Sequence, residues 1–171
     1  MLEKTREGIL SLSVLRRCTA IIISVAIVLT VVFIFSNSMK PPAESTADSN
    51  AVKDVIATII PPESDLGQKV LSNIRKIAHF TEYGLLGIEV TALLFVLTEK
   101  RRTRYLASAK TLLAALVVAF FDETIQMFTK RGPMIQDMWI DVGGFFTYAL
   151  LTHAAIELVC LVKYVIKKIK R

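Results

Sequence analysis

The sequence is poor in cysteine and lacks any C-x-x-C pair. Its two cysteines, Cys18 and Cys160, lie at ends of apolar runs that we expect to face the cytoplasm, where a disulfide is not expected. Palmitoylation near a membrane boundary is one alternative. The simpler prediction is that both are small, buried apolar residues.

Short catalytic motifs are also lacking. H-E-x-x-H, G-x-S-x-G and S-x-x-K are all absent, so the metalloprotease and serine-enzyme classes that carry them are not predicted. No internal repeat and no low-complexity segment is present. Whether the chain is an enzyme is therefore open at this point.

What the sequence has in excess is apolar residues gathered into long runs. Apolar residues make up 53% of the 171, and the mean hydropathy is +0.53, above what a soluble core of this size needs. Helices of about 20 residues cross about 30 Å of hydrocarbon. The runs at 18–35, 77–98, 111–128 and 138–162 therefore predict an all-α fold, a bundle of four transmembrane helices.

The positive charges indicate how this bundle is oriented. Of the 21 Lys and Arg residues, 14 lie in 1–17, 99–110 and 163–171. By the positive-inside rule these segments face the cytoplasm, so both termini are inside. The net charge of +6 sits at helix ends, where lipid headgroups explain it. Nucleic acid is therefore not an expected partner, whereas membrane lipids are.

The expected organisation is one multi-pass domain of the cell membrane. The first run is expected to be an uncleaved signal anchor, because no A-x-A site follows it. A tight basic loop is expected at 99–110, and an outer turn containing Gly132 and Pro133 at 129–137. The segments are a cytoplasmic leader (1–17), the membrane domain (18–162) with an extracytoplasmic loop (36–76), and a basic cytoplasmic tail (163–171).

The extracytoplasmic loop is expected to hold short amphipathic helices. Apolar residues recur at helical spacing in 50–60, with Asn50 as a candidate N-cap, and Asp65 could cap a second short helix. These helices would lie on the outer membrane surface or cover the end of the bundle as a lid.

Ionisable residues inside three of the predicted helices fall at one depth, near the outer leaflet. A charge at a helix centre costs about 2.5–3.5 kcal/mol, so such residues face a partner or a water-filled cavity. Spacings of three and four residues place each set on one helix face. The sequence therefore predicts one outward-facing polar pocket, with Arg75, Lys76 and Arg131 at its rim. Its predicted binding residues are Lys76, His79, Glu82, Tyr83, Asp122, Glu123, Gln126, Arg131, Asp137 and Asp141.

A purely structural polar clamp between the helices is the alternative to a binding or catalytic site. Glu89 continues the face of Glu82 towards the bilayer middle, either as a proton acceptor or as a protonated, hydrogen-bonded core residue. His153 and Glu157 form a further pair four residues apart, which we interpret as structural.

Three segments resemble the signatures of the VanZ-like membrane proteins. They are KIAHFTEYGLLG (76–87), DETIQMF (122–128) and RGPMIQDMWIDVGG (131–144). Their order and gaps match over about residues 15–165. Asp141 stands where many members carry Asn, and FSNS (35–38) lacks the Gln of the family's Phe-Ser-x-Gln.

The resemblance implies a Gram-positive cell-envelope protein linked to low-level resistance to the glycopeptide teicoplanin. The first hypothesis is a membrane module that binds an envelope lipid, a lipid-linked cell-wall precursor or a glycopeptide. The second is an intramembrane enzyme with a divalent metal or with general acid–base groups, either of which would be supplied by His79, Glu82, Asp122, Glu123 and Asp141. The third is a small proton-coupled transporter or flippase along Glu82 and Glu89. Neither the ligand nor the oligomeric state follows from the sequence.

Overall fold

The computed structural model describes the backbone of residues 2–98, 101–129 and 135–169, and the side chains of 13–98, 111–129 and 135–169. Within these ranges the chain is all-helical, as predicted. Four of the helices are long and apolar enough to span a membrane, over Ser13–Met39, Ile74–Leu97, Thr111–Phe128 and Ile135–Ile169. The helices are α1 (Leu2–Met39), α2 (Pro42–Ala57), α3 (Asp65–Ser72), α4 (Ile74–Leu97), α5 (Arg101–Phe128) and α6 (Ile135–Ile169).

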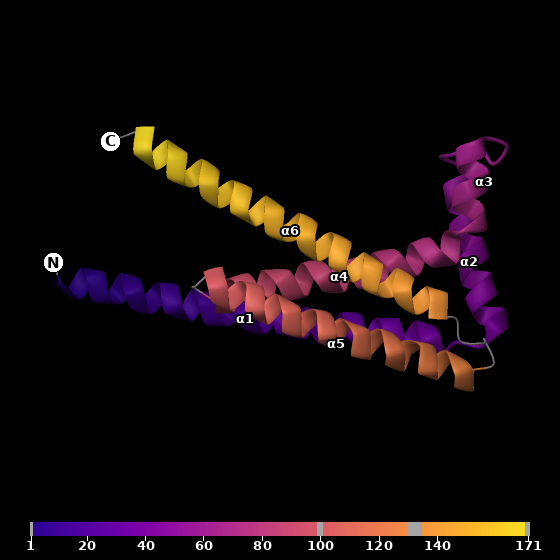
Figure 1. The fold of residues 1–171 in the computed structure, drawn as a ribbon, viewed down its shortest axis with the longest axis horizontal. Helices are drawn as coiled ribbons and strands as arrows, with labels where there is room; N and C mark the ends of the chain where they lie inside the picture. Colours follow the sequence, from indigo (N-terminus) through magenta and orange to yellow (C-terminus); the bar gives the residue numbers. More distant parts are fainter. Residues whose placement is uncertain (1, 99–100, 130–134, 170–171) are drawn as a thin grey trace.

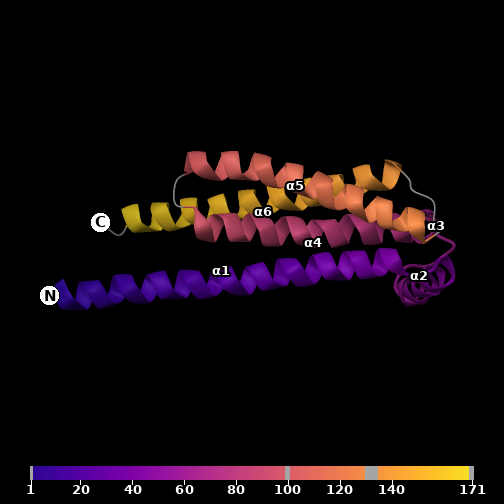
Figure 2. The ribbon, with the colours of Figure 1, turned by 90° about the horizontal axis from the view of Figure 1, so that it is seen from below.

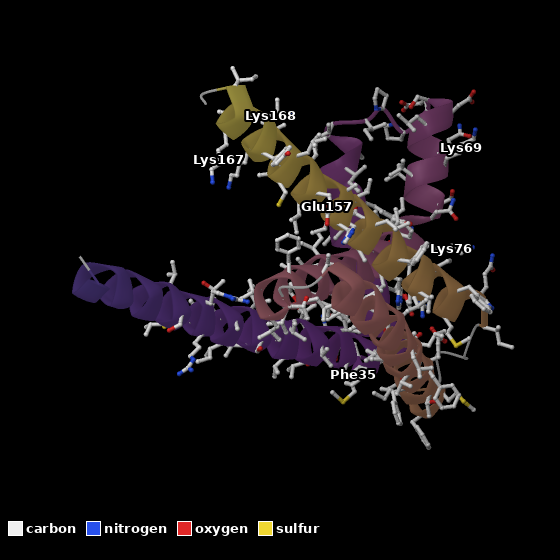
Figure 3. All side chains as sticks on the ribbon, turned by 60° about the vertical axis from the view of Figure 1, so that its left-hand side comes forward. Phe35, Lys69, Lys76, Glu157, Lys167 and Lys168 are labelled. Atoms are coloured by element: carbon white, nitrogen blue, oxygen red, sulfur yellow. The ribbon has the colours of Figure 1, made fainter. Side chains whose placement is uncertain are left out.

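The four long helices form an elongated bundle, and α2 and α3 lie across one end of it (Figure 1). The start of α1 and the end of α6 both lie at the opposite end (Figure 2), well apart from each other (Figure 1). This placement agrees with two termini on the same side of a membrane; which side faces the cytoplasm stays a prediction. Lys69 and Lys76 lie towards the α2–α3 end, whereas Lys167 and Lys168 lie at the far end of α6 (Figure 3).

Most large apolar side chains point outward. Ile22, Phe120 and Leu151, for example, are each more than half exposed, and the buried apolar core is small. Such a continuous apolar surface would be a liability in water but is what a bilayer covers. The core joins α1, α4, α5 and α6 through Ile34, Tyr83, Leu86, Ala115, Ala119 and Phe145.

Polar contacts tie α1 to α4 at three heights. Near the end that holds both termini, the Arg16 guanidinium donates to the carbonyl of Val96 at 2.8 and 3.2 Å. In the middle of α1, the hydroxyl of Thr30 donates to Oε1 of Glu89 at 3.0 Å. At the α2 end, Asn37 bonds Glu82. The two helices are therefore joined along most of their shared length.

Several local predictions were wrong. The segment 101–110 is not a loop but the first turns of α5, because it contains Ala, Leu, Arg and Lys and no Gly or Pro. The expected turn with Gly132 and Pro133 lies outside the described residues. Cys18 and Cys160 are exposed on the bundle surface rather than buried.

The caps of the two short helices also differ from prediction. Asn50 lies inside α2, which begins earlier because Pro42 occupies a first-turn position that its fixed φ favours. In α3 the cap is Ser64, whose hydroxyl accepts from the Gly67 N–H at 3.0 Å. Asp65 is instead the first helical residue.

Candidate functional site

Three buried residues from three helices meet near the α2 end of the bundle. His79 on α4 has its Nδ1 3.2 Å from Oδ1 of Asp141 on α6 and 4.0 Å from Oδ2 of Asp122 on α5. Both aspartates have no exposed surface, and His79 is only 8% exposed. A carboxylate accepts hydrogen bonds, so an Nδ1–H of His79 would donate to Asp141. We call these three residues the His–Asp cluster.

The His–Asp cluster has unused hydrogen-bonding capacity. Asp122 Oδ1 and Asp141 Oδ2 are buried without a hydrogen-bond partner. Among the described side chains, His79 is the only basic group within ion-pair distance of either aspartate. Leaving such an oxygen buried and unpaired is costly. The cluster is therefore suited to accept a further donor or a cation.

Gln126 connects the His–Asp cluster to neighbouring helices. It lies one turn after Asp122 on α5, and its amide nitrogen is 3.3 Å from Oδ2 of that residue. The same nitrogen lies 3.4 Å from Oε1 of Glu123 and 3.4 Å from the hydroxyl oxygen of Ser38. Its Oε1 accepts from Nη2 of Arg75 at 2.6 Å. One amide thus links acids of α5 to a cation at the start of α4.

The end of α1 supplies two residues that the sequence analysis did not assign to the site. Asn37 Nδ2 donates to Oε1 of Glu82 at 3.0 Å. Ser38 is 2% exposed and bonds Gln126. Two sequence signals pointed to this helix end: polar residues that close an apolar helix, and the partial match of FSNS (35–38) to the family's Phe-Ser-x-Gln.

Close approach of α4 and α6 positions the His–Asp cluster. A Cβ at Gly144, three residues after Asp141, would clash with the backbone carbonyl of Phe80, the residue next to His79. A Cβ at Gly87 would clash with the carbonyl of Phe145. Small residues allow helix backbones to approach in membranes. These two glycines therefore bring the ring of His79 within reach of α6.

A cavity of about 330 Å³ lies beside the His–Asp cluster, between α1, α2 and α4. His79 and Glu82 belong to its wall, so the cluster and the cavity adjoin. Lys40 also lines it and pairs with Asp48 of α2 at 2.7 Å. Its other polar lining residues are Asn37, Ser38, Ser45, Asp48, Ser49 and Arg75. Because α2 forms one wall, this helix covers the cavity from one side.

The structure brings six of the predicted binding residues into one connected polar region, namely His79, Glu82, Asp122, Glu123, Gln126 and Asp141. Tyr83 is fully buried in the core, and its hydroxyl has no hydrogen-bond partner. Asp137 is buried one turn before Asp141, with Oδ1 unpaired. Lys76 is half-buried and does not line the cavity. Arg131 lies outside the described residues.

Two further contacts of ionisable residues lie apart from the His–Asp cluster. Glu89 bonds Thr30 of α1 through Oε1, while its Oε2 is buried without a partner. His153 Nε2 is 3.9 Å from Oε1 of Glu157 on the same helix, α6. Figure 3 labels Glu157 midway along that helix. The first contact joins α1 to α4, the second lies within α6, and neither lines the cavity.

Comparison with known proteins gives one match. The model of the VanZ/LLP1 family matches residues 22–158, which is more than half of the chain. The matched range includes all of α4 and the described parts of the polar region on α1, α5 and α6. No curated protein and no solved structure matches the chain.

Proposed function

Since this chain belongs to the VanZ/LLP1 family, we propose that it is a multi-pass protein of the bacterial cell membrane that binds a phosphate-bearing lipid headgroup in its cavity. The ligand would be an envelope lipid or a lipid-linked cell-wall precursor. Through this binding, the protein would alter susceptibility to glycopeptides of the teicoplanin type. Family membership and four membrane-length apolar helices fit a membrane protein.

The observation that carries the proposal is the position and hydrogen bonding of Arg75. This residue lines the cavity, and its Nε is buried without a hydrogen-bond partner, while its Nη2 is held by Gln126. A guanidinium fixed at one nitrogen is oriented in advance, and its remaining N–H groups match phosphate oxygens. Lys40, which is ion-paired with Asp48, is a second cation that lines the cavity.

The shape of the cavity suits an amphipathic ligand. Phe33 and Val52 line it and are 55% and 48% exposed, so its rim is apolar and open to the bundle surface. The most buried polar groups of its wall are Ser38 and His79, which are 2% and 8% exposed. A headgroup could occupy the polar part while the first methylene groups lie along the apolar rim, which would recover hydrophobic free energy.

Binding is tested with the full chain in lipid nanodiscs. Fluorescent lipid II and a fluorescent anionic phospholipid are titrated against the wild-type protein and against Arg75→Gln. We expect the substitution to weaken binding at least about tenfold, the loss typical of a charge-assisted hydrogen bond. Arg75→Lys keeps the charge but not the planar fork and should restore only part of the affinity.

The matched control is Lys69→Gln, which removes a positive charge from the exposed face of α3 at the same end of the molecule (Figure 3). Its affinity should equal that of the wild type. Equal binding by Arg75→Gln and the wild type would show that the cavity does not recognise a headgroup phosphate. A preference for lipid II over the phospholipid would identify the precursor as the ligand.

The antibiotic role is tested separately, in cells. Expression in a teicoplanin-susceptible Gram-positive host should raise the minimum inhibitory concentration of teicoplanin, and Arg75→Gln should reduce that increase. Membrane fractions must contain both proteins at the same level. An increase that is identical for the two proteins would separate the resistance phenotype from headgroup binding.

Acid–base catalysis on a lipid-linked substrate is a second candidate function. The contact of His79 with Asp141 favours this function, because a histidine that acts as a general base is often oriented by a carboxylate. Incubating lipid II with the protein in nanodiscs and analysing the lipids by mass spectrometry checks this candidate. A new product that forms with wild type and not with His79→Gln supports catalysis; unchanged lipid II contradicts it for this substrate.

A further inference from the structure

We propose that the His–Asp cluster binds one divalent transition-metal ion, Zn²⁺ or Mn²⁺, through His79, Asp122 and Asp141. This site is distinct from the headgroup contacts of Arg75, and its existence does not depend on lipid binding. It would place a metal ion beside the wall of the cavity, because His79 belongs to both.

The spacing of the three residues fits a single ion. Metal–nitrogen and metal–oxygen bonds to Zn²⁺ measure about 2.0–2.2 Å, so two ligand atoms of one ion are at most about 4.4 Å apart. His79 Nδ1 lies 3.2 Å from Asp141 Oδ1 and 4.0 Å from Asp122 Oδ2. One ligand atom from each residue can be chosen so that all three lie within 4.8 Å of one another. Small side-chain rotations would bring them around one ion.

Charge provides an independent argument. Asp122 and Asp141 are both completely buried, and the one basic group within ion-pair distance among the described side chains is the imidazole of His79. Two buried carboxylates with so little compensation are expensive in a protein interior. A divalent cation would neutralise both.

The unpaired oxygens point to the same conclusion. Asp122 Oδ1 and Asp141 Oδ2 are buried without hydrogen-bond partners, and both belong to fully buried side chains. A purely structural clamp would be expected to satisfy these oxygens internally. Gln126 bonds the other oxygen of Asp122 and so restricts the rotation of that side chain, as outer hydrogen bonds do for metal-binding carboxylates.

The ligand types indicate the class of metal. One imidazole with two carboxylates suits Zn²⁺ or Mn²⁺ better than Ca²⁺ or Mg²⁺, which prefer oxygen ligands alone. No sulfur ligand is near, because both cysteines are on the bundle surface. Three protein ligands leave coordination positions for water or an exogenous ligand.

The metal alone is the probe in the test. Tag-free full-length protein is purified in detergent, stripped with a chelator, and titrated with ZnCl₂, MnCl₂ or MgCl₂; bound metal is then measured by elemental analysis after desalting. We expect about one Zn²⁺ or Mn²⁺ per chain. At a free-metal concentration of about 100 times the dissociation constant, the thermal midpoint should rise by about 5–10 °C.

Matched variants locate the site. His79→Gln and Asp141→Asn should each weaken metal binding at least about tenfold. The controls are His153→Gln, which removes the chain's only other histidine, and Asp54→Asn on the exposed face of α2. Both controls should bind like the wild type. Loss of metal in a control, or its retention in both cluster variants, would overturn the proposal.

A spectroscopic measurement on the wild type covers the case in which the cluster variants fail to fold. Electron spin-echo modulation of bound Mn²⁺ should show a directly coordinated imidazole nitrogen, in the wild type and equally in His153→Gln. Metal that shows no nitrogen coupling in the wild type would be bound elsewhere. Wild-type protein that retains no stoichiometric metal would leave protons and water as the partners of the two aspartates and refute the site.

Discussion

Asn37 at the end of α1 donates a hydrogen bond of 3.0 Å to Oε1 of Glu82 on α4. The polar pattern of the sequence placed the pocket on the other three membrane helices and did not include α1. The contact nevertheless joins α1 to an acid on the cavity wall. It thereby makes the first membrane helix part of the site, and not only an anchor.

Asn37→Ala should therefore destabilise the bundle. Removing the amide leaves a half-buried carboxylate without this donor, which costs about 1–2 kcal/mol of unfolding free energy. Unfolding in mixed micelles by sodium dodecyl sulfate, followed by circular dichroism, measures the change. Asn50→Ala, on the exposed face of α2, should have little effect; an equal loss in both variants would argue against a specific role for the contact.

The close contact of α4 and α6 predicts contrasting effects of two adjacent substitutions. Gly144→Ala places a methyl group against the carbonyl of Phe80, whereas a Cβ at Gly143 would meet nothing nearer than Phe80 Cε2 at 4.0 Å. The first should cost about 1–3 kcal/mol. The second should be neutral or stabilising by about 0.5–1 kcal/mol, because alanine is a better helix former than glycine. The same micelle unfolding experiment compares them, and similar values for the two variants would show that α4 and α6 pack less closely.

Thr30→Val should weaken the attachment of α1 to α4 in the middle of the membrane. The substitution removes the donor to Oε1 of Glu89, whose other oxygen already lacks a partner. Hydrogen bonds between membrane helices contribute about 0.6 kcal/mol on average and up to about 1.7. Thr19→Val is the control on the same helix, because the hydroxyl of Thr19 bonds only the carbonyl of Leu15 within α1. Unfolding free energies that do not distinguish the two variants would contradict a specific contact.

Ser64→Ala should loosen α3 without affecting the membrane bundle. The hydroxyl of Ser64 caps the helix through the Gly67 N–H, and loss of such a cap costs about 1 kcal/mol. Amide hydrogen exchange in 65–72 should accelerate about fivefold, while exchange in α4 is unchanged. Ser72→Ala, which removes a serine at the other end of α3 whose hydroxyl donates to the carbonyl of Lys69 and accepts from the side-chain amide of Asn73, serves as the control. Unchanged protection in Ser64→Ala would show that the cap does not stabilise α3.

The number of membrane helices and the depth of the polar residues could be predicted from the sequence. The length of an apolar run shows directly whether a helix can cross a membrane. The three-residue spacing of His79 and Glu82 places both on one helix face. For His79 and Asp141, the sequence predicted only that they lie at the same depth, not that they are in contact. The distance between them depends on how closely α4 and α6 pack, which the glycines at 87 and 144 decide.

What could not be predicted depended on short-range geometry. Asn37 and Ser38 carry no periodicity that separates a site residue from a polar helix end. The start of α5 at Arg101 was missed because the basic charge indicated a loop, although these residues have good helix propensity. The exposed cysteines were misassigned because sequence alone does not say which side of a membrane helix faces lipid.

The contacts of Arg16, Thr30 and Asn37 with α4 have a consequence for the membrane around the protein. They extend over 22 residues of α1, from Arg16 to Asn37, or about 32 Å along a helix, which is close to the thickness of the hydrocarbon layer. Membrane helices adjust to thicker or thinner bilayers by changing their tilt. Because α1 and α4 are joined near both ends of this stretch and between them, they should tilt as a pair. The cavity between them should therefore keep its dimensions in bilayers of different thickness.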